Sequence, residues 1–344
     1  MIAALLIFLG TCFVLTVGRL PGFRIDRTGA AIIGASLMIA FGVLTMEEAI
    51  RSVNHDTLIL LFGMMIVVAN LRLSGFFALV SAWVVEHTHH PLVLLVAIVF
   101  VSGFFSAFFV NDTMCLVLTP LVLDIVTRLR RNPIPYLLAI AMASNIGSAA
   151  TITGNPQNMM IGTFSQIPYR TFAAAIAPIS AVGLMITVAL VAVTYRREFF
   201  SVPRIEVDRP RVRVNRALLW KSVAASGAMI FLFFTGLSVP KIAVVTGAIL
   251  LVTRRVKPER IYREIDWSLL VLFAGLFVVV AGVEKTLLTG HIPAANCSSL
   301  IFSSTLVQMC GPAWQFRTTS PGISLTENSP PASHFQVFRY SRYE

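Results

Sequence analysis

Residues 144–158 of this sequence read SNIGSAATITGNPQN, and they stand inside an uncharged stretch that runs from residue 132 to residue 169. A helix needs about 20 apolar residues to cross a hydrocarbon core of about 30 Å, so this stretch is far too long for one straight crossing. Gly154-Asn155-Pro156 interrupts it, and glycine and proline are the residues that a helix interior tolerates least. The stretch therefore predicts a transmembrane helix that is broken at membrane depth.

The composition of the whole chain points the same way. Of its 344 residues, 56% are hydrophobic and 12% are charged, and the mean hydropathy is +0.81. Soluble domains carry about 25% charged residues, so this chain has too few charges to cover a water-exposed surface. The net charge of +11 comes from basic residues in short segments between apolar runs, which is the positive-inside pattern and not a nucleic-acid signature. The fold class expected is an all-α polytopic membrane protein.

Nine apolar runs are candidate spans. They cover residues 1–18, 28–46, 57–71 continuing to 85, 91–123, 132–169, 171–195, 217–240, 241–253 and 267–283. The first run has no basic leading region and no small-x-small cleavage site, so we interpret it as a retained span and not as a signal peptide. The arginine-rich loops all fall on the cytoplasmic side if residues 91–127 form a re-entrant hairpin that enters and leaves on that side.

The chain also resembles itself. Residues 56–63 (DTLILLFG) recur as residues 266–275 (DWSLLVLFAG), at a spacing of roughly 210 residues. The loop 45–56 carries a charge of −2 and the loop 253–266 a charge of +2. Copies that enter the membrane in opposite directions would show this reversal, and inverted repeats are typical of secondary transporters.

These features predict four regions. Residues 1–195 form a first transmembrane repeat, with the hairpin at about 91–127 and the broken helix at about 132–169. Residues 196–216 form a basic cytoplasmic linker with seven arginines, residues 217–290 a partial second repeat, and residues 291–344 an atypical tail.

Two polar segments are the candidates for chemistry, 109–113 and 144–158. Hydrocarbon cannot satisfy free backbone groups or amides, so both segments must face protein or a water-filled cavity. An ionisable side chain at that depth costs about 3 kcal/mol, which makes Asp112 a functional candidate. The candidate ion- and substrate-binding residues are Asn111, Asp112, Thr113, Ser144, Asn145, Thr151, Thr153, Gly154, Asn155, Pro156 and Asn158.

The chemistry of these groups suits ions. Carbonyl groups freed at 154–156 can coordinate a small hard cation, and the half-helix that follows presents free N–H groups to an anion. No nucleophile–base pair stands beside them, and neither HExxH nor GxSxG occurs, so we expect no enzyme and no catalytic residue. No metal site or cofactor is expected beyond Na⁺ or H⁺ as the coupling ion.

Several alternatives stay open. Residues 147–150 could serve only in helix packing, and Asp112 could pair with an arginine. His87, His89 and His90 could bind a metal or lie in a solvated loop. Residues 111–113 match a glycosylation sequon, although their depth argues against its use. A passive channel would need a polar stripe along several spans, whereas here the polarity is confined to two loops.

At these two segments the chain resembles the ion transporter superfamily of divalent anion/sodium symporters, citrate carriers and arsenite permeases. The symporters carry Ser-Asn-Thr at a hairpin tip, where this chain has Asn111-Asp112-Thr113, and a Gly-Thr-Pro-Pro-Asn type of break, where it has residues 154–158. The resemblance covers roughly residues 1–290. It implies that hairpin tip and broken helix jointly hold one coupling ion and part of the substrate. Asp112 replaces a neutral asparagine, a departure that argues against sodium coupling and allows protons instead.

The last part of the sequence departs from that pattern. Residues 291–344 hold 13 Ser/Thr and no apolar run of about 20 residues, where the superfamily has a second hairpin and a second broken helix. We interpret this segment as a frameshifted or otherwise altered end, with a biased but genuine tail as the alternative. An altered end would remove half of the transport site.

The function expected is secondary active transport of a small anion, a carboxylate or an inorganic oxyanion, coupled to Na⁺ or H⁺ by alternating access in a bacterial inner membrane. The alternatives are an arsenite or antimonite permease, a Na⁺/H⁺ antiporter, a passive channel and an inactive fragment. The partners expected are the anion, the coupling cation and the lipid bilayer, with a homodimer as an open alternative and no nucleic acid.

Overall fold

The computed structural model describes the chain except residues 1, 19–24, 89, 201–213, 253–256 and 289–344. The described residues form helices joined by turns, with no strand among them. Five helices of this part are long and apolar enough to cross a membrane, which confirms an all-α polytopic membrane protein. They are residues 55–74, 91–108, 169–194, 216–233 and 267–286. The atypical tail expected at 291–344 lies outside the described residues.

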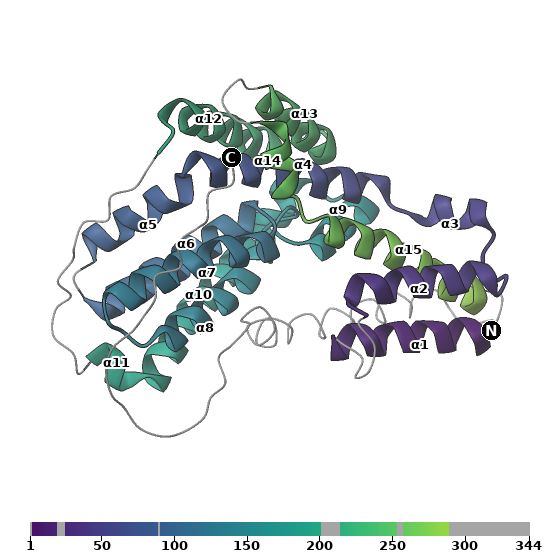
Figure 1. Cartoon of the computed structure of the whole chain (residues 1–344), viewed down its shortest axis with the longest axis horizontal. Coiled ribbons are helices and arrows are strands. Elements are labelled where there is room, and N and C mark those ends of the chain that lie inside the picture. Colours follow the sequence, from purple (N-terminus) through teal and green to yellow (C-terminus); the bar gives the residue numbers. More distant parts are fainter. Residues whose placement is uncertain (1, 19–24, 89, 201–213, 253–256, 289–344) are drawn as a thin grey trace, which may run out of the picture.

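Eight helices form one packed group that holds two copies of the same motif. The first copy is α1 (Ile2–Val17), α2 (Arg27–Ala40), α3 (Met46–Ser52) and α4 (His55–Ser74). The second copy is α12 (Arg216–Phe233), α13 (Val239–Leu251), α14 (Pro258–Arg263) and α15 (Trp267–Leu288). Figure 1 shows α1, α2, α3 and α15 together at one end, near the N-terminus, and α12, α13 and α14 over α4.

The two copies exchange packing partners. Helix α4 packs on α13, and its equivalent α15 packs on α2. Both contacts pass through a glycine: a Cβ on Gly63 would lie 2.7 Å from the backbone of Ala243, and one on Gly275 would lie 2.9 Å from the backbone of Ala31. Short α3 lies on α15, and short α14 lies on α4. The long helix and the short helix of each copy therefore pack on helices of the other copy.

The helix starts define the register of the repeat. Asn54 caps α4 by accepting from Thr57 N, and Asp266 caps α15 by accepting from Leu269 N at 3.0 Å. These caps are 212 positions apart, as are Gly63 and Gly275. The sequence suggested an alignment of Asp56 with Asp266. In the structure the residue equivalent to Asp266 is the helix cap Asn54, so the alignment at the helix start is shifted by two residues.

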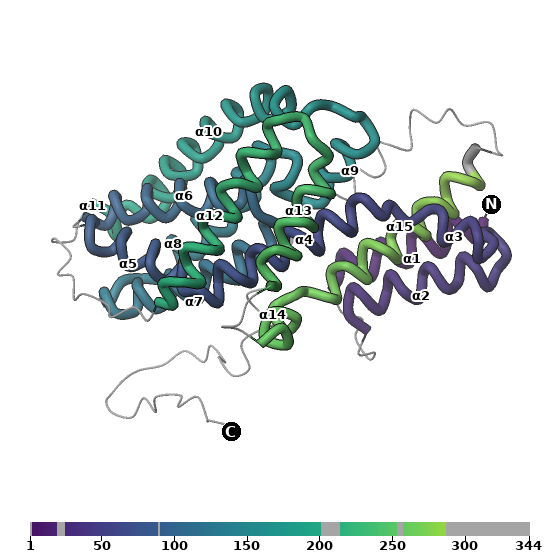
Figure 2. Tube along the Cα trace, turned by 90° about the horizontal axis from the view of Figure 1, so that it is seen from above, coloured from purple at the N-terminus to yellow at the C-terminus, as the bar shows by residue number. Residues whose placement is uncertain are grey.

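The copies run in opposite directions. In Figures 1 and 2, α3 joins the end of α2 to the start of α4 at the same end of the molecule, so α2 and α4 are antiparallel. Gly63 and Ile66 of α4 meet Ala243 and Gly247 in the same order, which makes α4 and α13 parallel. Helix α2 is thus antiparallel to its copy α13, as expected for an inverted repeat.

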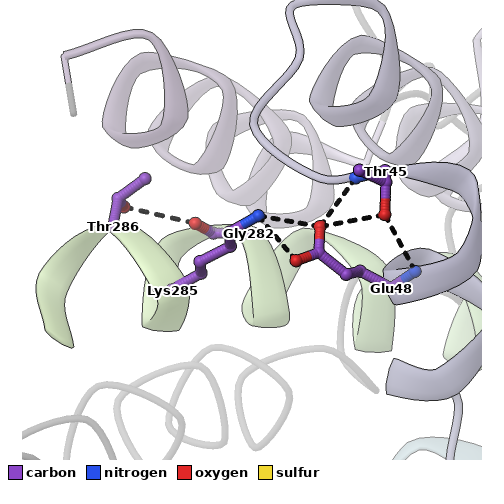
Figure 3. Close-up of polar contacts among 5 residues, drawn as sticks. All are labelled: Thr45, Glu48, Gly282, Lys285 and Thr286. Carbon is purple, nitrogen blue, oxygen red and sulfur yellow. Dashed lines mark hydrogen bonds and ion pairs between the residues drawn. The ribbon is translucent and has the colours of Figure 1, made fainter. Parts of the chain in front are cut away.

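One ion pair on each side ties a short helix to the long helix of the other copy. Lys285 Nζ donates to Glu48 at 2.7 and 2.8 Å, and Thr45 N donates to the same carboxylate, as Figure 3 shows. Arg72, in the last turn of α4, pairs with Glu264 beside α14 at 2.5 Å. Pairing with Lys285, and then the Thr45 N–H, lowers the pKa of Glu48 to about 2.

The second group contains the hairpin and the broken helix. Its helices are α5 (Phe76–His87), α6 (Pro91–Phe108), α7 (Asn111–Arg128), α8 (Pro133–Ser148), α9 (Pro156–Ser165), α10 (Tyr169–Thr194) and α11 (Arg196–Phe200). Helix α8 is central and contacts α6, α7 and α10. It packs most closely on α6, where a Cβ on Gly147 would lie 2.3 Å from the carbonyl oxygen of Gly103. The two groups meet mainly where α4 contacts α9, α5 and α7.

Three helix boundaries differ from the sequence-based runs. The run 57–85 is divided at Gly75, whose φ of +84° ends α4 and turns the chain into α5. The run 28–46 ends at Ala40, just before Gly42 at φ +68°. The hairpin turns at Phe109-Val110, so Asn111 to Thr113 form the first turn of α7 and not the turn itself. Of the basic linker expected at 196–216, the structure describes α11, the residues that start α12 and little else.

Candidate functional site

Four helix ends meet where the hairpin tip touches the break in the long helix. Helix α6 ends at Phe108 and α7 begins at Asn111, while α8 ends at Ser148 and α9 begins at Pro156. Asn111 N donates to Gly154 O at 3.0 Å and joins the two chain reversals directly. The contact places the hairpin tip at the depth of the break, part-way along the α8–α9 crossing.

These four ends carry opposite partial charges. The N-terminal ends of α7 and α9 carry the positive ends of the helix dipoles, which favour an anion. The C-terminal ends of α6 and α8 carry the negative ends of the helix dipoles, which favour a cation. One small volume therefore offers electrostatic complementarity to both kinds of ion.

Three residues make the break. A Cβ on Gly154 would lie 2.1 Å from Ser148 O, so no larger residue fits where the loop folds back on the end of α8. Pro156 is the first residue of α9, where its missing N–H costs nothing. Asn155 caps α9 by accepting from Asn158 N at 2.7 Å.

The amide of Asn158 holds the loop together. Its Nδ2 donates to the carbonyl oxygens of Ser148, Ala149 and Thr151, at 3.3, 3.1 and 2.8 Å. The Asn155 amide reaches Ser148 as well, at 3.4 Å to its carbonyl oxygen and 3.3 Å to its Oγ. The amide groups predicted as ligands thus position the backbone of the break.

Hairpin tip and α8 are joined by a second set of side chains. Asn111 Nδ2 donates to Asn145 Oδ1 at 3.0 Å, and Ser144 Oγ donates to Asn111 O at 3.1 Å. Ser144 also lies 2.7 Å from Ser106 Oγ on α6. All of these residues except Ser106 were predicted from the sequence, and the structure brings them together.

Thr151 and Thr153 bind the end of α6. Thr151 Oγ1 donates to Ala107 O, and Thr153 Oγ1 lies 3.5 Å from Phe108 O. Thr153 also lies 2.9 Å from the hydroxyl of Tyr169. Their hydroxyls were expected to be ligand oxygens, but in the structure they are occupied by protein partners.

Comparison with known proteins identifies the family of this chain. The sequence profile of a family described as citrate transporter matches residues 5–310. The chain belongs to the citrate transporter family. Named relatives include a 46 kDa membrane protein of Mycobacterium leprae, 27% identical over 83% of this chain and 70% of its own length. An uncharacterised transporter of Mycobacterium tuberculosis is 30% identical over 80% and 67%, and a silicon efflux transporter of Oryza sativa is 29% identical over 79% and 68%.

This citrate transporter family member is thus a multi-pass membrane transporter and not an enzyme. It spans about 70% or less of the length of these relatives. Its family match extends through the hairpin, the break and the second copy of the repeat, so the site described above lies within the matched region.

Asp112 and Thr113 lie apart from the hydrogen-bond network of this transporter. Both sit in the first turn of α7 and are partly exposed. Within the part of the chain that the structure describes, the Asp112 carboxylate makes no hydrogen bond and no ion pair. Its place next to free N–H groups favours the charged form, whereas its depth disfavours that form unless a cation or proton joins it.

The structure also bears on the open alternatives. Gly147 is a packing residue, because it lies against the backbone of Gly103. His87 Nδ1 lies 2.9 Å from Trp83 O, and His90 Nδ1 accepts from Leu92 N, so both serve local helix ends, and His89 lies outside the described residues.

Two residues of the network were missed by the sequence reasoning, Ser106 and Tyr169. Ser106 stands in the apolar run of α6 and Tyr169 stands beside Arg170 at the start of α10, so both lie outside the two polar segments that the sequence singled out.

Proposed function

We propose that this member of the citrate transporter family is a secondary active carrier of a small anion, coupled to Na⁺ or H⁺ by alternating access. The observation that carries the proposal is the meeting of four helix ends at one depth. Positive and negative helix ends in one place can bind an anion and a cation together. Coupled transport requires that the two ions bind together.

The anion is expected at the first turns of α7 and α9. The positive ends of the two helix dipoles attract carboxylate or oxyanion oxygens without a fixed positive charge, so that release on the other side is not prevented by a strong ion pair. A carboxylate such as citrate, after which the family is named, and an inorganic oxyanion both fit this chemistry.

The cation is expected on the other side of the same loop, near the ends of α6 and α8. Asp112 adds a carboxylate beside these groups, and burial at membrane depth favours its neutral or cation-bound form. Substrate binding and the cation gradient would be linked through this residue. The presence of an acid in place of the asparagine of related symporters favours the proton over sodium.

A second candidate is a permease for weakly acidic hydroxides such as arsenite or silicic acid. One relative is named as a silicon efflux transporter, which motivates this alternative. A bacterial inner membrane remains the proposed location, in keeping with the mycobacterial relatives.

The test is transport by the purified chain in proteoliposomes. Labelled citrate, smaller dicarboxylates, phosphate, arsenite and silicic acid are offered with an imposed Na⁺ gradient or an imposed pH gradient. We expect one anion to accumulate above its outside concentration, and an ionophore that collapses the coupling gradient to abolish the accumulation. Uptake that only equilibrates, unaffected by either gradient, would indicate a channel. No uptake of any substrate would contradict the proposal for this chain.

A further inference from the structure

Tyr169 stands where the site meets the other helix group. It is the first residue of α10 and only 4% of its surface is exposed, although it carries a hydroxyl. Its ring packs on Phe233 of α12, with centroids 5.4 Å apart, and meets Phe234 edge-on at 5.0 Å. A buried hydroxyl needs a partner, and here the partner is Thr153.

The hydroxyls form a chain that ends on backbone carbonyls of α6. Tyr169 Oη is 2.9 Å from Thr153 Oγ1, which is 3.3 Å from Thr151 Oγ1 and 3.5 Å from Phe108 O. Thr151 donates to Ala107 O. Each hydroxyl has one proton, so if Thr153 donates toward Phe108 or Thr151, Tyr169 must be the donor to Thr153. Tyr169 is then the start of the chain.

The carbonyl groups at the end of this chain matter to the cation. Ala107 and Phe108 belong to the last turn of α6, whose carbonyl oxygens have no partners within the helix. They are part of the C-terminal end that faces the proposed cation. Their orientation depends on the two threonines, and the position of Thr153 depends on Tyr169.

We propose that Tyr169 is a positioning residue of the transport site. Its ring is anchored on α12, and its hydroxyl fixes the Thr153–Thr151 pair and through it the α6 carbonyl groups that a coupling cation would meet. The proposal rests on the proposed function for its effect on cation binding. Its structural part, the anchoring of the loop 149–155 by one phenolic hydroxyl, does not.

The central variant is Tyr169→Phe, which keeps the ring on Phe233 and Phe234 and removes only the hydroxyl. We expect the half-saturating cation concentration to rise about 3- to 10-fold, as for the loss of one buried hydrogen bond. The maximal rate of substrate exchange should stay within about twofold, because exchange at saturating cation does not depend on its affinity. Thr153→Val should have the same effect, and the double variant should be no worse than either single variant.

Matched controls remove the same groups elsewhere on α10. Tyr195→Phe deletes a phenolic hydroxyl at the far end of the helix, and Thr187→Val deletes a hydroxyl that bonds within the helix to Gly183 O. Both should leave the cation dependence unchanged. A full additive loss in the Tyr169→Phe/Thr153→Val double variant would show that the two residues act separately and would overturn the proposal.

Hydrogen exchange gives a readout that does not need transport. In lipid nanodiscs, peptides that cover residues 149–155 should exchange faster in Tyr169→Phe and in Thr153→Val, but not in the two controls. Phe234→Leu, which keeps the hydroxyl and loosens the ring, should also speed exchange. Wild-type protection in Tyr169→Phe would refute the positioning role. A wild-type protein that fails to accumulate any anion would refute the proposed function alone, because the exchange experiment would still decide the role of Tyr169.

Discussion

At the scale of single residues, the site is held by amides and hydroxyls that bind the protein's own backbone. Asn158 alone donates to three carbonyl groups of the break. Replacement of such a residue is expected to have two effects. The loop loses hydrogen bonds that stabilise it, and the ion site changes its shape. Stability and transport must therefore be measured together.

Asn158→Ala is expected to abolish coupled uptake while the protein still inserts in the membrane. It leaves buried carbonyl oxygens without donors, which costs about 1 to 3 kcal/mol of stability. Asn155→Ala removes a helix cap worth about 1 kcal/mol and should have the same functional effect. Asn132→Ala, which removes the cap of α8 far from the loop, is the control. Normal uptake and ion dependence in both Asn155→Ala and Asn158→Ala would leave these residues with a packing role only.

Asp112→Asn is expected to separate binding from coupling. The amide stays neutral at every pH, so the linkage between substrate and cation gradient is lost. Substrate exchange should survive, because it needs no net movement of the coupling ion, whereas uphill accumulation should disappear. Both are measured in the same vesicles, with pH and Na⁺ varied separately. Asp124→Asn, an exposed acid near the far end of α7 that pairs with Arg128, is the matched control. Undiminished accumulation with unchanged pH and Na⁺ dependence would show that Asp112 does not couple.

The sequence predicted which residues gather at the site, but not the hydrogen-bond partners that they have there. Polar residues are easily recognised within an apolar stretch of sequence, so Asn111, Asn145 and Asn155 could be predicted as members of the site. Whether an oxygen faces an ion or a neighbouring carbonyl depends on packing between α6 and the loop. The sequence around Thr151 and Thr153 does not indicate which partner each hydroxyl has.

At the scale of elements, the ion pair of Glu48 with Lys285 connects α3 to α15. Because pairing lowers the pKa of Glu48 to about 2, its contribution to stability is complete above the usual carboxyl value of 4.5 and is lost as the pH falls toward 2. Glu48→Gln and Lys285→Met should lower the melting midpoint at pH 7, and Lys285→Arg should not. The difference between wild type and Glu48→Gln should vanish in acid and shrink at high salt. A difference that persists unchanged at the lowest pH would mean that the pair is not its source.

The topology of the hairpin is a separate prediction. Each arm has 18 residues, about 27 Å of helix, and α6 is long enough to cross a membrane by itself. We still expect both open ends of the hairpin on the cytoplasmic side, since its tip stops at the break between α8 and α9. In a background without the native cysteines, Arg130→Cys should react with an impermeant maleimide only from the inside. Labelling from the outside would overturn this topology.

Helix existence was predictable at this scale, and helix ends were less so. The apolar runs marked every long helix, because hydrocarbon leaves no other structure for such a run. The division at Gly75 was not predicted, and the hairpin turn was expected at 111–113, just past its observed place at Phe109-Val110. Backbone conformation decides both.

At the scale of the whole molecule, the two copies are held together by equivalent close contacts. Gly63→Ala and Gly275→Ala should each destabilise the protein, by about 1 to 3 kcal/mol, because each Cβ would meet backbone of the opposite copy. Gly227→Ala on α12 has open space around its Cβ and should be neutral or slightly stabilising. Melting midpoints in detergent compare the three. Equal behaviour of all three variants would mean that these contacts do not hold the copies together.

The repeat itself was detectable in the sequence, but its register was not. The shared residue type of Asp56 and Asp266 suggested one alignment, whereas the helix-capping residues and the contact glycines define another that differs by two residues. The partner exchange between the copies has no sequence signal at all.

That exchange has a consequence for how the protein is made. Ala31 meets Gly275, which follows it by 244 positions, so α2 enters the bilayer long before its packing partner exists. At about 5 to 20 residues per second, a ribosome needs roughly 10 to 50 s to supply α15. During that interval the first half must wait in the membrane with its glycine-lined faces open to lipid or to an insertion chaperone. The nascent chain is then most exposed to quality-control proteolysis, and slow codons between the copies would lengthen that exposure.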